Sequence, residues 1–588
     1  MSNPSQTASP FPRLSAWRPR FALSAVLALV ACAYIRAASF EFVYDDLGQI
    51  VDNPKIKSWR LALTFFSTHV WSQTTRVAFY YRPVYMLWLR LNYALFGLQP
   101  VYWHLAAIAV HLLAGLLLYF LVRRLGEDAW VGIVAVLLFG LHPAHIESVA
   151  WISGTTESLM ACLLLGSMLL YWRHRDSAAT KPTRVAPASL VLALLAVLAK
   201  ETAIVIPALI FSSEWILYQR DKSPKRRFVS SFAAATPYLL ISFGFILART
   251  LVLGSVSPPA TTLGRLSVLL AWPADLLFYG SHDALPVHLS GFYRRLAVAH
   301  IGVGNFVFPA LIVLVGAVGL FWGSRRSRVF AFLAAWWAIL MLPVLNVTLF
   351  NNAENLHDRY LYLPSAAVCV ALAMLLAALK SRYRKTGIAA LIAIAAAYAG
   401  SLTAELPYWR NDFVLAKRGM EVSPGQPIAP QVMGNALLRN GNIEAAIPYL
   451  VDSLDSMPSN VETLYSLAYS YCELNALDLA EHCIDKAIAL VPSEPRAHLL
   501  LGRIRLKQKR LDEAETECRR AIALQPISNG VAGDHYYLGD VLYAKGHLED
   551  ALREYRLEPE NGPATDPAFE AAQRRIREIE GRRASEGR

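Results

Sequence analysis

The chain is poor in charged residues and in cysteine. Charged residues make up 17% and apolar residues 55% of its 588 residues, against about 25% and about 45–50% in soluble proteins. The shortage of charge is confined to the part before residue 405, and the rest has the composition of an ordinary soluble protein. These proportions exclude one large soluble protein and predict a membrane part followed by a water-exposed part.

Six cysteines are few for this length. Cys32, Cys162 and Cys369 fall in apolar runs, where cysteine packs as a small core residue. The other three lie in the water-exposed part without the spacing of metal ligands: Cys472, Cys483 and Cys518. These cysteines therefore indicate no metal centre, and the sequence leaves open whether two of them form a disulfide. No cofactor is predicted.

The net charge of +12 does not predict a nucleic-acid partner, because the basic residues of the membrane part sit in short loops between apolar runs. Membrane proteins keep such loops on the cytoplasmic side. The loops placed there are Arg13 to Arg20, Arg123-Arg124, Arg173 to Arg184, Arg220 to Arg227, Arg325 to Arg328 and Lys380 to Lys385.

A membrane-spanning helix needs about 20 apolar residues, and fewer where neighbouring helices cover it. The candidate spans are 21–38, 103–122, 129–141, 158–172, 187–199, 203–219, 228–248, 302–322, 329–349, 362–379 and 387–404. We expect the first to be retained as a signal anchor. A further apolar stretch, 264–281, is interrupted by Pro273 and holds Asp275, so it is predicted to lie at the surface or re-enter. Eleven crossings then place the C-terminus on the extracytoplasmic side.

Prolines recur every 34 residues in the C-terminal part, which is the period of the tetratricopeptide (TPR) repeat: Pro424, Pro458, Pro492 and Pro526. Small residues 12 apart repeat with them, as in Gly434 with Ala446 and Gly502 with Ala514. An insertion near 527–534 displaces the fourth repeat. Such repeats stack into a solenoid whose concave face binds an extended peptide or protein.

The predicted domains are a cytoplasmic tail over 1–20, a transmembrane domain over 21–405, a linker over 406–426, a TPR domain of about four repeats over 427–562 and a solvated tail over 563–588. The polar motifs of the membrane part fall on the extracytoplasmic loops. Any chemistry is therefore expected there.

The first extracytoplasmic loop opens with an acidic pair, Asp45 and Asp46. Two adjacent carboxylates just beyond a membrane helix are costly unless they are solvated or used. One of them can act as a general base on an acceptor hydroxyl. A solvated loop start with an Asx turn is the other reading.

Two further motifs lie at the outer ends of spans. His142, His145 and Glu147 are close enough in sequence to hold a metal or a phosphate, although Pro143 breaks the zinc-protease pattern. Polar capping at the membrane surface is the simpler reading. Lys200-Glu201 joins two spans, where Lys200 can meet a lipid phosphate with Glu201 orienting it, or the two can form an ion pair.

Two arginines offer the same phosphate chemistry. Arg82 stands in Tyr81-Arg82-Pro83, and Arg359 stands between Asp358 and Tyr360. A guanidinium matches phosphate with two parallel hydrogen bonds. Arg359 can equally reach out to the interface from an aromatic belt.

Taken in order, these motifs resemble the transmembrane and TPR-repeat-containing (TMTC) O-mannosyltransferases, which are GT-C membrane glycosyltransferases. The matching stretches are Tyr44-Asp45-Asp46 with Asn53-Pro54, Tyr81-Arg82-Pro83, His142-Pro143-x-His145-x-Glu147, Lys200-Glu201, Arg359-Tyr360-Leu361-Tyr362-Leu363-Pro364-Ser365 and Trp409-Arg410-Asn411-Asp412. They extend over almost the whole chain.

The resemblance implies a polyprenyl-phosphate-linked sugar donor, with mannose expected, and a Ser or Thr hydroxyl of a protein acceptor. It places the catalytic pair at Asp45 and Asp46. Residues assigned to the donor and its phosphate are Arg82, His142, His145, Glu147, Lys200, Glu201 and Arg359. The chain departs from the family at Gly154-Thr155-Thr156-Glu157, where relatives often carry an arginine after the glycine.

The sequence thus predicts an all-α protein in which a GT-C-like membrane bundle of about eleven spans precedes a TPR solenoid. The predicted function is transfer of the sugar to a protein acceptor held on the concave face, with membrane lipids around the bundle. The alternative is a non-catalytic membrane scaffold whose repeats recruit partners for envelope assembly. A transporter is disfavoured because the charges sit at helix ends rather than in mid-span.

Overall fold

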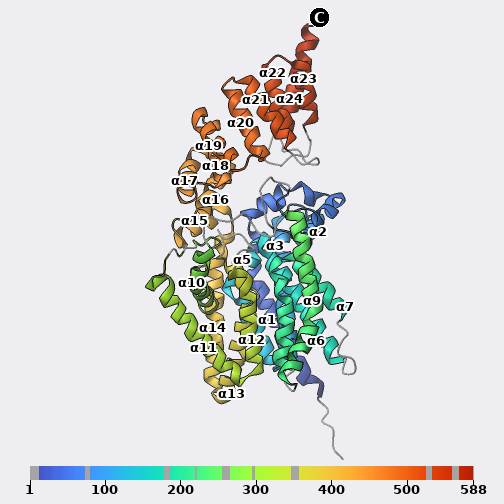
Figure 1. The fold of residues 1–588 in the computed structure, drawn as a ribbon, viewed down its shortest axis with the longest axis vertical. Coiled ribbons are helices and arrows are strands. Elements are labelled where there is room, and N and C mark those ends of the chain that lie inside the picture. The colour runs from blue at the N-terminus through green and yellow to red at the C-terminus, as the bar shows by residue number, and fades with distance from the viewer. Residues whose placement is uncertain are drawn as a thin grey trace, which may run out of the picture.

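The computed structural model describes residues 12–72, 80–177, 186–218, 222–254, 265–294, 298, 300–345, 356–524, 533–558 and 568–586. Over these ranges the chain forms helices and no strands. A bundle of helices α1–α14 lies at one end of the long axis, and helices α15–α24 form an array at the other (Figure 1). The two parts of the predicted all-α architecture are confirmed.

The bundle helices are α1 Pro12–Tyr34, α2 Pro83–Phe96, α3 Pro100–Arg124, α4 Ala129–Leu141, α5 Ile146–Ala150, α6 Thr156–Ser177, α7 Pro187–Ala199, α8 Ile206–Ser213, α9 Pro224–Leu253, α10 Arg265–Ala284, α11 Phe308–Arg326, α12 Arg328–Leu345, α13 Ser365–Arg382 and α14 Arg384–Glu405. The array helices are α15 Asp412–Val422, α16 Ile428–Arg439, α17 Ile443–Ser456, α18 Val461–Glu473, α19 Leu477–Leu490, α20 Pro495–Lys507, α21 Leu511–Ala523, α22 Asp534–Ala544, α23 Leu548–Leu557 and α24 Ala568–Glu586.

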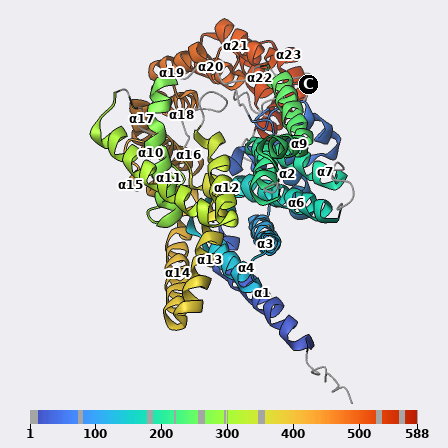
Figure 2. The same ribbon diagram turned by 60° about the horizontal axis from the view of Figure 1, so that its bottom comes forward.

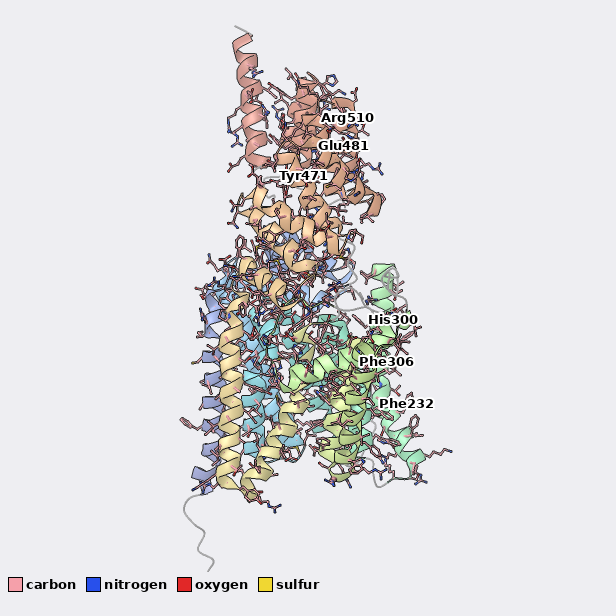
Figure 3. All side chains as sticks on the ribbon, turned by 90° about the vertical axis from the view of Figure 1, so that its left-hand side faces the viewer. Phe232, His300, Phe306, Tyr471, Glu481 and Arg510 are labelled. Carbon is pink, nitrogen blue, oxygen red and sulfur yellow. The ribbon has the colours of Figure 1, made fainter. Side chains whose placement is uncertain are left out.

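Within the described residues the predicted spans lie on helices, apart from residues 302 and 362–364, and residues 219 and 346–349 lie outside the described ranges. Among the described residues, nine helical stretches are long and apolar enough to cross a membrane. A tenth candidate is α4 with the segment Pro143–Ala150, bent by 57°, and α7 is a shorter apolar helix. Figure 3 shows the outer surface of the bundle, where Phe232 on α9 is exposed. Lipid tails cover such a surface in a bilayer.

The stretch predicted not to cross, 264–281, forms α10. It is not among the nine spanning candidates. The helix continues through Pro273 and buries Asp275 and Asp283. In Figure 1 it lies at the end of the bundle that faces the array.

The basic loops gather at the end of the bundle away from the array. Arg124 pairs with Asp176 there, and Arg175 pairs with Glu214, so the ends of α3, α6 and α8 lie together. The start of α1 and the turn between α13 and α14 lie at this end too (Figures 1 and 2). The basic loops that the sequence predicts to be cytoplasmic therefore lie together at one end of the bundle, opposite the array.

The array consists of four helical hairpins, α16–α17 to α22–α23, and Figure 2 shows them as an arc over one end of the bundle. The small residues lie where the two helices of a hairpin touch. A Cβ on Gly434 would lie 2.7 Å from Leu450, and one on Gly502 would lie 2.7 Å from the Cys518 Sγ. Arg510 and Glu481 of neighbouring hairpins approach to 2.8 Å (Figure 3). The thiols of Cys472, Cys483 and Cys518 are free.

Three predicted boundaries differ from the structure. The helix α1 begins at Pro12, inside the predicted tail 1–20. The predicted linker 406–426 holds the short helix Leu406–Trp409 and α15, and it buries Leu415 and Ala416 in the bundle core. The predicted solvated tail 563–588 contains α24, which packs Ala572, Ile576 and Ile579 against α22 and α23. The apolar faces of α15 and α24 explain the second and third differences. Each of these helices covers an end of the array that would otherwise be exposed.

Candidate active site

The acidic pair lies in a tight turn just after α1. Asp46 is fully buried and accepts hydrogen bonds from the Ser153 amide at 2.8 Å, the Ser153 hydroxyl at 2.5 Å and the Val43 amide at 3.2 Å. Asp45 is half-buried, and its Oδ2 lies 3.4 Å from the Gln49 amide nitrogen. Asp46 therefore holds the turn against Ser153, whereas Asp45 keeps access to solvent.

Burial raises the pKa of the Asp46 carboxyl to about 7, against the opposing effect of its hydrogen bonds from Ser153 and Val43. The ordinary value near 3.8 applies to the unfolded chain. Between these two pH values the folded protein therefore binds a proton that the unfolded chain has lost. The contribution of Asp46 to stability is greatest below about pH 4 and is lost as the pH rises through about 7.

The variant Asp46→Asn tests this titration, because its amide stays uncharged at every pH. We expect the stability of Asp46→Asn relative to the wild type to rise between pH 5 and pH 8, since only the wild type must ionise a buried carboxyl. Thermal unfolding of both proteins in detergent at several pH values measures the difference. The same difference at pH 5 and pH 8 would contradict the assignment.

Three cations and three glutamates meet beside this turn. Arg82 donates through Nε to Glu201 Oε2 at 2.8 Å and through Nη2 to Oε1. Arg359 pairs with Glu147 through its guanidinium and donates its backbone amide to the same carboxylate at 2.9 Å. Lys200 pairs with Glu157. Each cation thus has a carboxylate that fixes its orientation.

These pairs form one electrostatic cluster, which we call the cation cluster: Arg82, Lys200 and Arg359 with Glu147, Glu157 and Glu201. Lys200 interacts electrostatically with Arg82 and Arg359 as well as with Glu157 and Glu201. The Lys200 Nζ and the Arg359 guanidinium each lie 5.2 Å from the Tyr360 ring centre. Segments far apart in the chain therefore converge on Tyr360.

Tyr85 links the cation cluster to the acidic pair. Its hydroxyl donates to Gln49 Oε1 at 2.9 Å, and Gln49 in turn contacts Asp45. The same hydroxyl interacts electrostatically with Asp45, Asp46 and Arg82. The carboxylates and the cations therefore belong to one region at the array end of the bundle.

The two arginines are the accessible cations of the cluster. The side chains of Arg82 and Arg359 are 15% and 16% exposed, whereas that of Lys200 is 2% exposed. A guanidinium has five N–H groups, so one that binds a carboxylate can also meet a phosphate oxygen. The arginines are therefore the better placed to contact a substrate, and Lys200 is a buried support.

Lys200 and Glu201 have different partners in the structure, so the ion pair between them, one of the two readings of the sequence, does not form. Lys200 has extended backbone, with φ −156° and ψ 134°, and Glu201 opens the next helical turn. Neighbouring side chains of extended chain point in opposite directions, so Lys200 reaches Glu157 and Glu201 reaches Arg82. The site residues that the sequence assignment missed are Glu157, Ser153, Tyr85 and Tyr360.

His142 and His145 do not lie in the cation cluster. Both are fully buried inside the bundle, where His142 Nε2 is 3.1 Å from the Asp283 carbonyl oxygen and His145 Nε2 is 2.8 Å from the Ser365 hydroxyl. Pro143 starts a helical turn that directs these side chains inward. Only Glu147 of this motif reaches the cluster, and it also lies 3.4 Å from His357 Nδ1.

Removing the partner of Lys200 is expected to destabilise the protein strongly. The variant Glu157→Gln leaves a buried ammonium without its carboxylate, which costs about 3–5 kcal/mol of unfolding free energy. The matched control is Asp176→Asn, which breaks the exposed pair with Arg124 and costs about 0–1 kcal/mol. Unfolding in detergent compares the two, and equal effects would contradict the buried pair.

Within the described ranges, no three His, Cys, Asp or Glu side chains are grouped so that they could hold a metal ion. The cluster itself alternates cations with carboxylates. The positive charge available to a bound anion in this region comes from Arg82, Lys200 and Arg359. The buried Arg249 on α9 adds to it, since it interacts electrostatically with Arg82 and Glu201.

Comparison with known proteins finds similar sequences among the protein O-mannosyl-transferases. Protein O-mannosyl-transferase TMTC3 of Mus musculus is 23% identical over 85% of this chain and 60% of its own length. The Homo sapiens TMTC3 is 22% identical over 86% of this chain and 60% of its own. The chain is thus similar to TMTC protein O-mannosyl-transferases over most of its own length. It spans about 60% of the length of these curated relatives.

The TMTC relatives include TMTC1 of Mus musculus, which is 34% identical over a shorter stretch, 32% of this chain and 22% of its own length. A tetratricopeptide repeat model matches residues 432–481 and 467–528, which confirms the predicted repeats. Among solved structures, the oligosaccharyltransferase of Archaeoglobus fulgidus is 14% identical, with a TM-score of 0.41 over 73% of this chain and 59% of its own.

Proposed function

We propose that this protein transfers mannose from a polyprenyl-phosphate carrier to Ser or Thr hydroxyls of a protein acceptor on the extracytoplasmic side. One observation carries the proposal: a half-buried carboxylate, Asp45, shares a region with two accessible arginines. A transfer of this kind needs a base for the acceptor and cations for the departing phosphate. The names of the TMTC relatives support the choice of mannose.

In this proposal Asp45 takes the proton of the acceptor hydroxyl, and the hydroxyl oxygen attacks the anomeric carbon from the face opposite the phosphate. The bond from that carbon to the phosphate oxygen breaks, and its electron pair leaves with the polyprenyl phosphate. The product is an O-linked sugar with inverted configuration. Asp46 has a different task, because its oxygens are engaged by Ser153 and Val43: it fixes the direction of Asp45.

The leaving phosphate gains negative charge during this step. Arg82 and Arg359 are proposed to stabilise that charge, with Glu201 and Glu147 holding the guanidinium planes. Charges oriented in advance lower a barrier more than charges that must first reorganise. Lys200 adds to the positive potential from beneath Tyr360. The step as written uses no divalent metal.

The extracytoplasmic placement of the site is proposed from the position of the basic loops. The basic loops lie at the opposite end of the bundle from the acidic pair and the repeats, and membrane proteins retain basic loops in the cytoplasm. The repeats then share a compartment with the acidic pair. We propose that their concave face holds the acceptor polypeptide in extended form.

The test is a transfer assay with the full-length protein in liposomes, radiolabelled polyprenyl-phosphate mannose and a Ser/Thr-rich acceptor polypeptide. We expect label on the acceptor at the same rate with and without EDTA, because the arginines carry the charge. Transfer that EDTA abolishes and a divalent metal restores would overturn the metal-free step. No transfer, together with full function of an Asp45→Asn protein in cells, would favour the scaffold alternative.

A further inference from the structure

The first repeat is joined to the acidic turn through one carboxylate on the preceding helix, α15. The backbone amide of Tyr44, the residue before Asp45, donates to Asp412 Oδ1 at 2.7 Å. Asp412 opens α15, and its Oδ2 pairs with Arg439 at the end of α16. One carboxylate therefore joins the acidic turn to the first hairpin of the array.

The hydrogen bond from the Tyr44 amide to Asp412 holds an unusual backbone conformation. Its φ of +52° lies in the left-handed region, which a bulky residue adopts only when its surroundings hold it there. This conformation sets the direction in which the next residue, Asp45, leaves the turn. A change at Tyr44 would therefore redirect the proposed base.

The segment 410–412, which we call the junction, contacts the turn in two other ways. The Glu41 amide donates to the Arg410 carbonyl at 3.0 Å, so the junction is hydrogen-bonded to both ends of the segment 41–44. The Tyr44 ring packs edge-on against Phe292 at 5.2 Å and lies 5.9 Å from Trp151. Trp151 stacks on Trp409, the residue before Arg410. Arg410 and Asp412 thus bond to the segment before Asp45 directly, and Trp409 reaches it through Trp151.

We propose that Asp412 is a positioning residue for the transfer step: it holds the left-handed backbone of Tyr44 and so fixes Asp45, while Arg439 ties it to the repeats. This inference rests on the proposed function, and it adds that α15, the helix that leads into the TPR hairpins, is part of the framework of the active site. If α15 only connected the bundle to the hairpins, a change in it would affect only the capture of long acceptors. Because Asp412 on α15 is hydrogen-bonded to the turn, its loss is expected to lower the rate constant for every acceptor.

The experiment compares Asp412→Ala, Asp412→Asn and a control. The alanine removes the acceptor for the Tyr44 amide, whereas asparagine keeps an oxygen there and loses the charge that pairs with Arg439. The control is Arg418→Ala, which breaks a junction pair with Glu405, 2.8 Å long, that does not touch Tyr44. The acceptor is a three-residue Ser/Thr peptide, too short to occupy several repeats.

We expect Asp412→Ala to lower kcat for the short peptide about tenfold or more, with KM little changed, since a hydrogen bond to a charged group is lost. Asp412→Asn should recover most of the rate, and Arg418→Ala should stay close to the wild type. Equal losses in the alanine and asparagine variants would mean that Asp412 serves only as the ion-pair partner of Arg439. A loss confined to long acceptors would mean that the junction serves acceptor capture. Either result overturns the proposal.

Hydrogen–deuterium exchange of residues 42–50 tests the junction without any enzymatic readout. The Tyr44 amide should exchange about tenfold faster or more in Asp412→Ala, and as in the wild type in Asp412→Asn and Arg418→Ala. Unchanged exchange in Asp412→Ala would overturn the proposal even if transfer fell. If the wild type transfers no sugar while exchange follows this pattern, the proposed function fails and the structural coupling stands.

Discussion

The variant Asp45→Asn is expected to lose sugar transfer by about 10²–10⁴-fold, which is the usual contribution of a general base. The amide has nearly the same shape as the carboxylate but cannot take the proton of the acceptor hydroxyl. Asp45 is half-buried and sits at the surface of the turn, so insertion and folding should survive. Transfer of labelled mannose and unfolding in detergent are measured on the same preparation.

Two comparisons make this result specific. Glu41→Gln removes an exposed carboxylate of the same loop and keeps the backbone hydrogen bond to Arg410, so transfer should stay close to that of the wild type. The double variant Asp45→Asn with Asp46→Asn should abolish transfer and still insert into the membrane. Full activity of that double variant would end the assignment of the acidic pair.

The second large effect is expected at Arg359. Replacement by alanine should lower transfer by about 10²–10³-fold, the usual loss when one donor to a developing charge is removed. It also leaves Glu147 buried beside His357 without its arginine, so stability should fall too. Steady-state transfer rates and unfolding measurements separate the two losses.

The double variant Arg359→Ala with Glu147→Gln distinguishes chemistry from stability, because it removes the stranded carboxylate together with the arginine. We expect its stability to return towards that of the wild type while transfer stays low. Recovery of transfer along with stability would show that Arg359 acts only as the partner of Glu147. As a remote control, Arg325→Ala at the basic end of the bundle should change neither quantity.

The spans and the repeats could be predicted from the sequence because their signals are local. Apolar length identifies a membrane helix, and the 34-residue period identifies a repeat. The residues 129–141 and 187–199 were predicted as spans although each is short, and both form helices of 13 residues. The sequence indicates a solvated helix end over 574–588, but it does not show that α24 packs on the array, because its apolar positions are few and widely spaced among charged residues.

The site was harder to predict, because its residues meet only in three dimensions. Arg82, Lys200 and Arg359 were found from local motifs, but their carboxylate partners lie 43 to 212 positions away along the chain. Glu157 carried a signal as the acidic end of the Gly154 motif, and Ser153 carried none. His142 and His145 were assigned to the donor site because they are close in sequence to Glu147. The turn that begins at Pro143 instead directs both side chains into the bundle.

The most direct measurement is a cryo-electron microscopy structure of the full-length protein with a polyprenyl-phosphate sugar bound. We expect the phosphate within hydrogen-bonding distance of Arg82 and Arg359, and the anomeric carbon on the side of Asp45. A phosphate bound among the basic loops at the far end, or an Asp45 carboxylate turned away from the sugar, would rule out this site for the transfer.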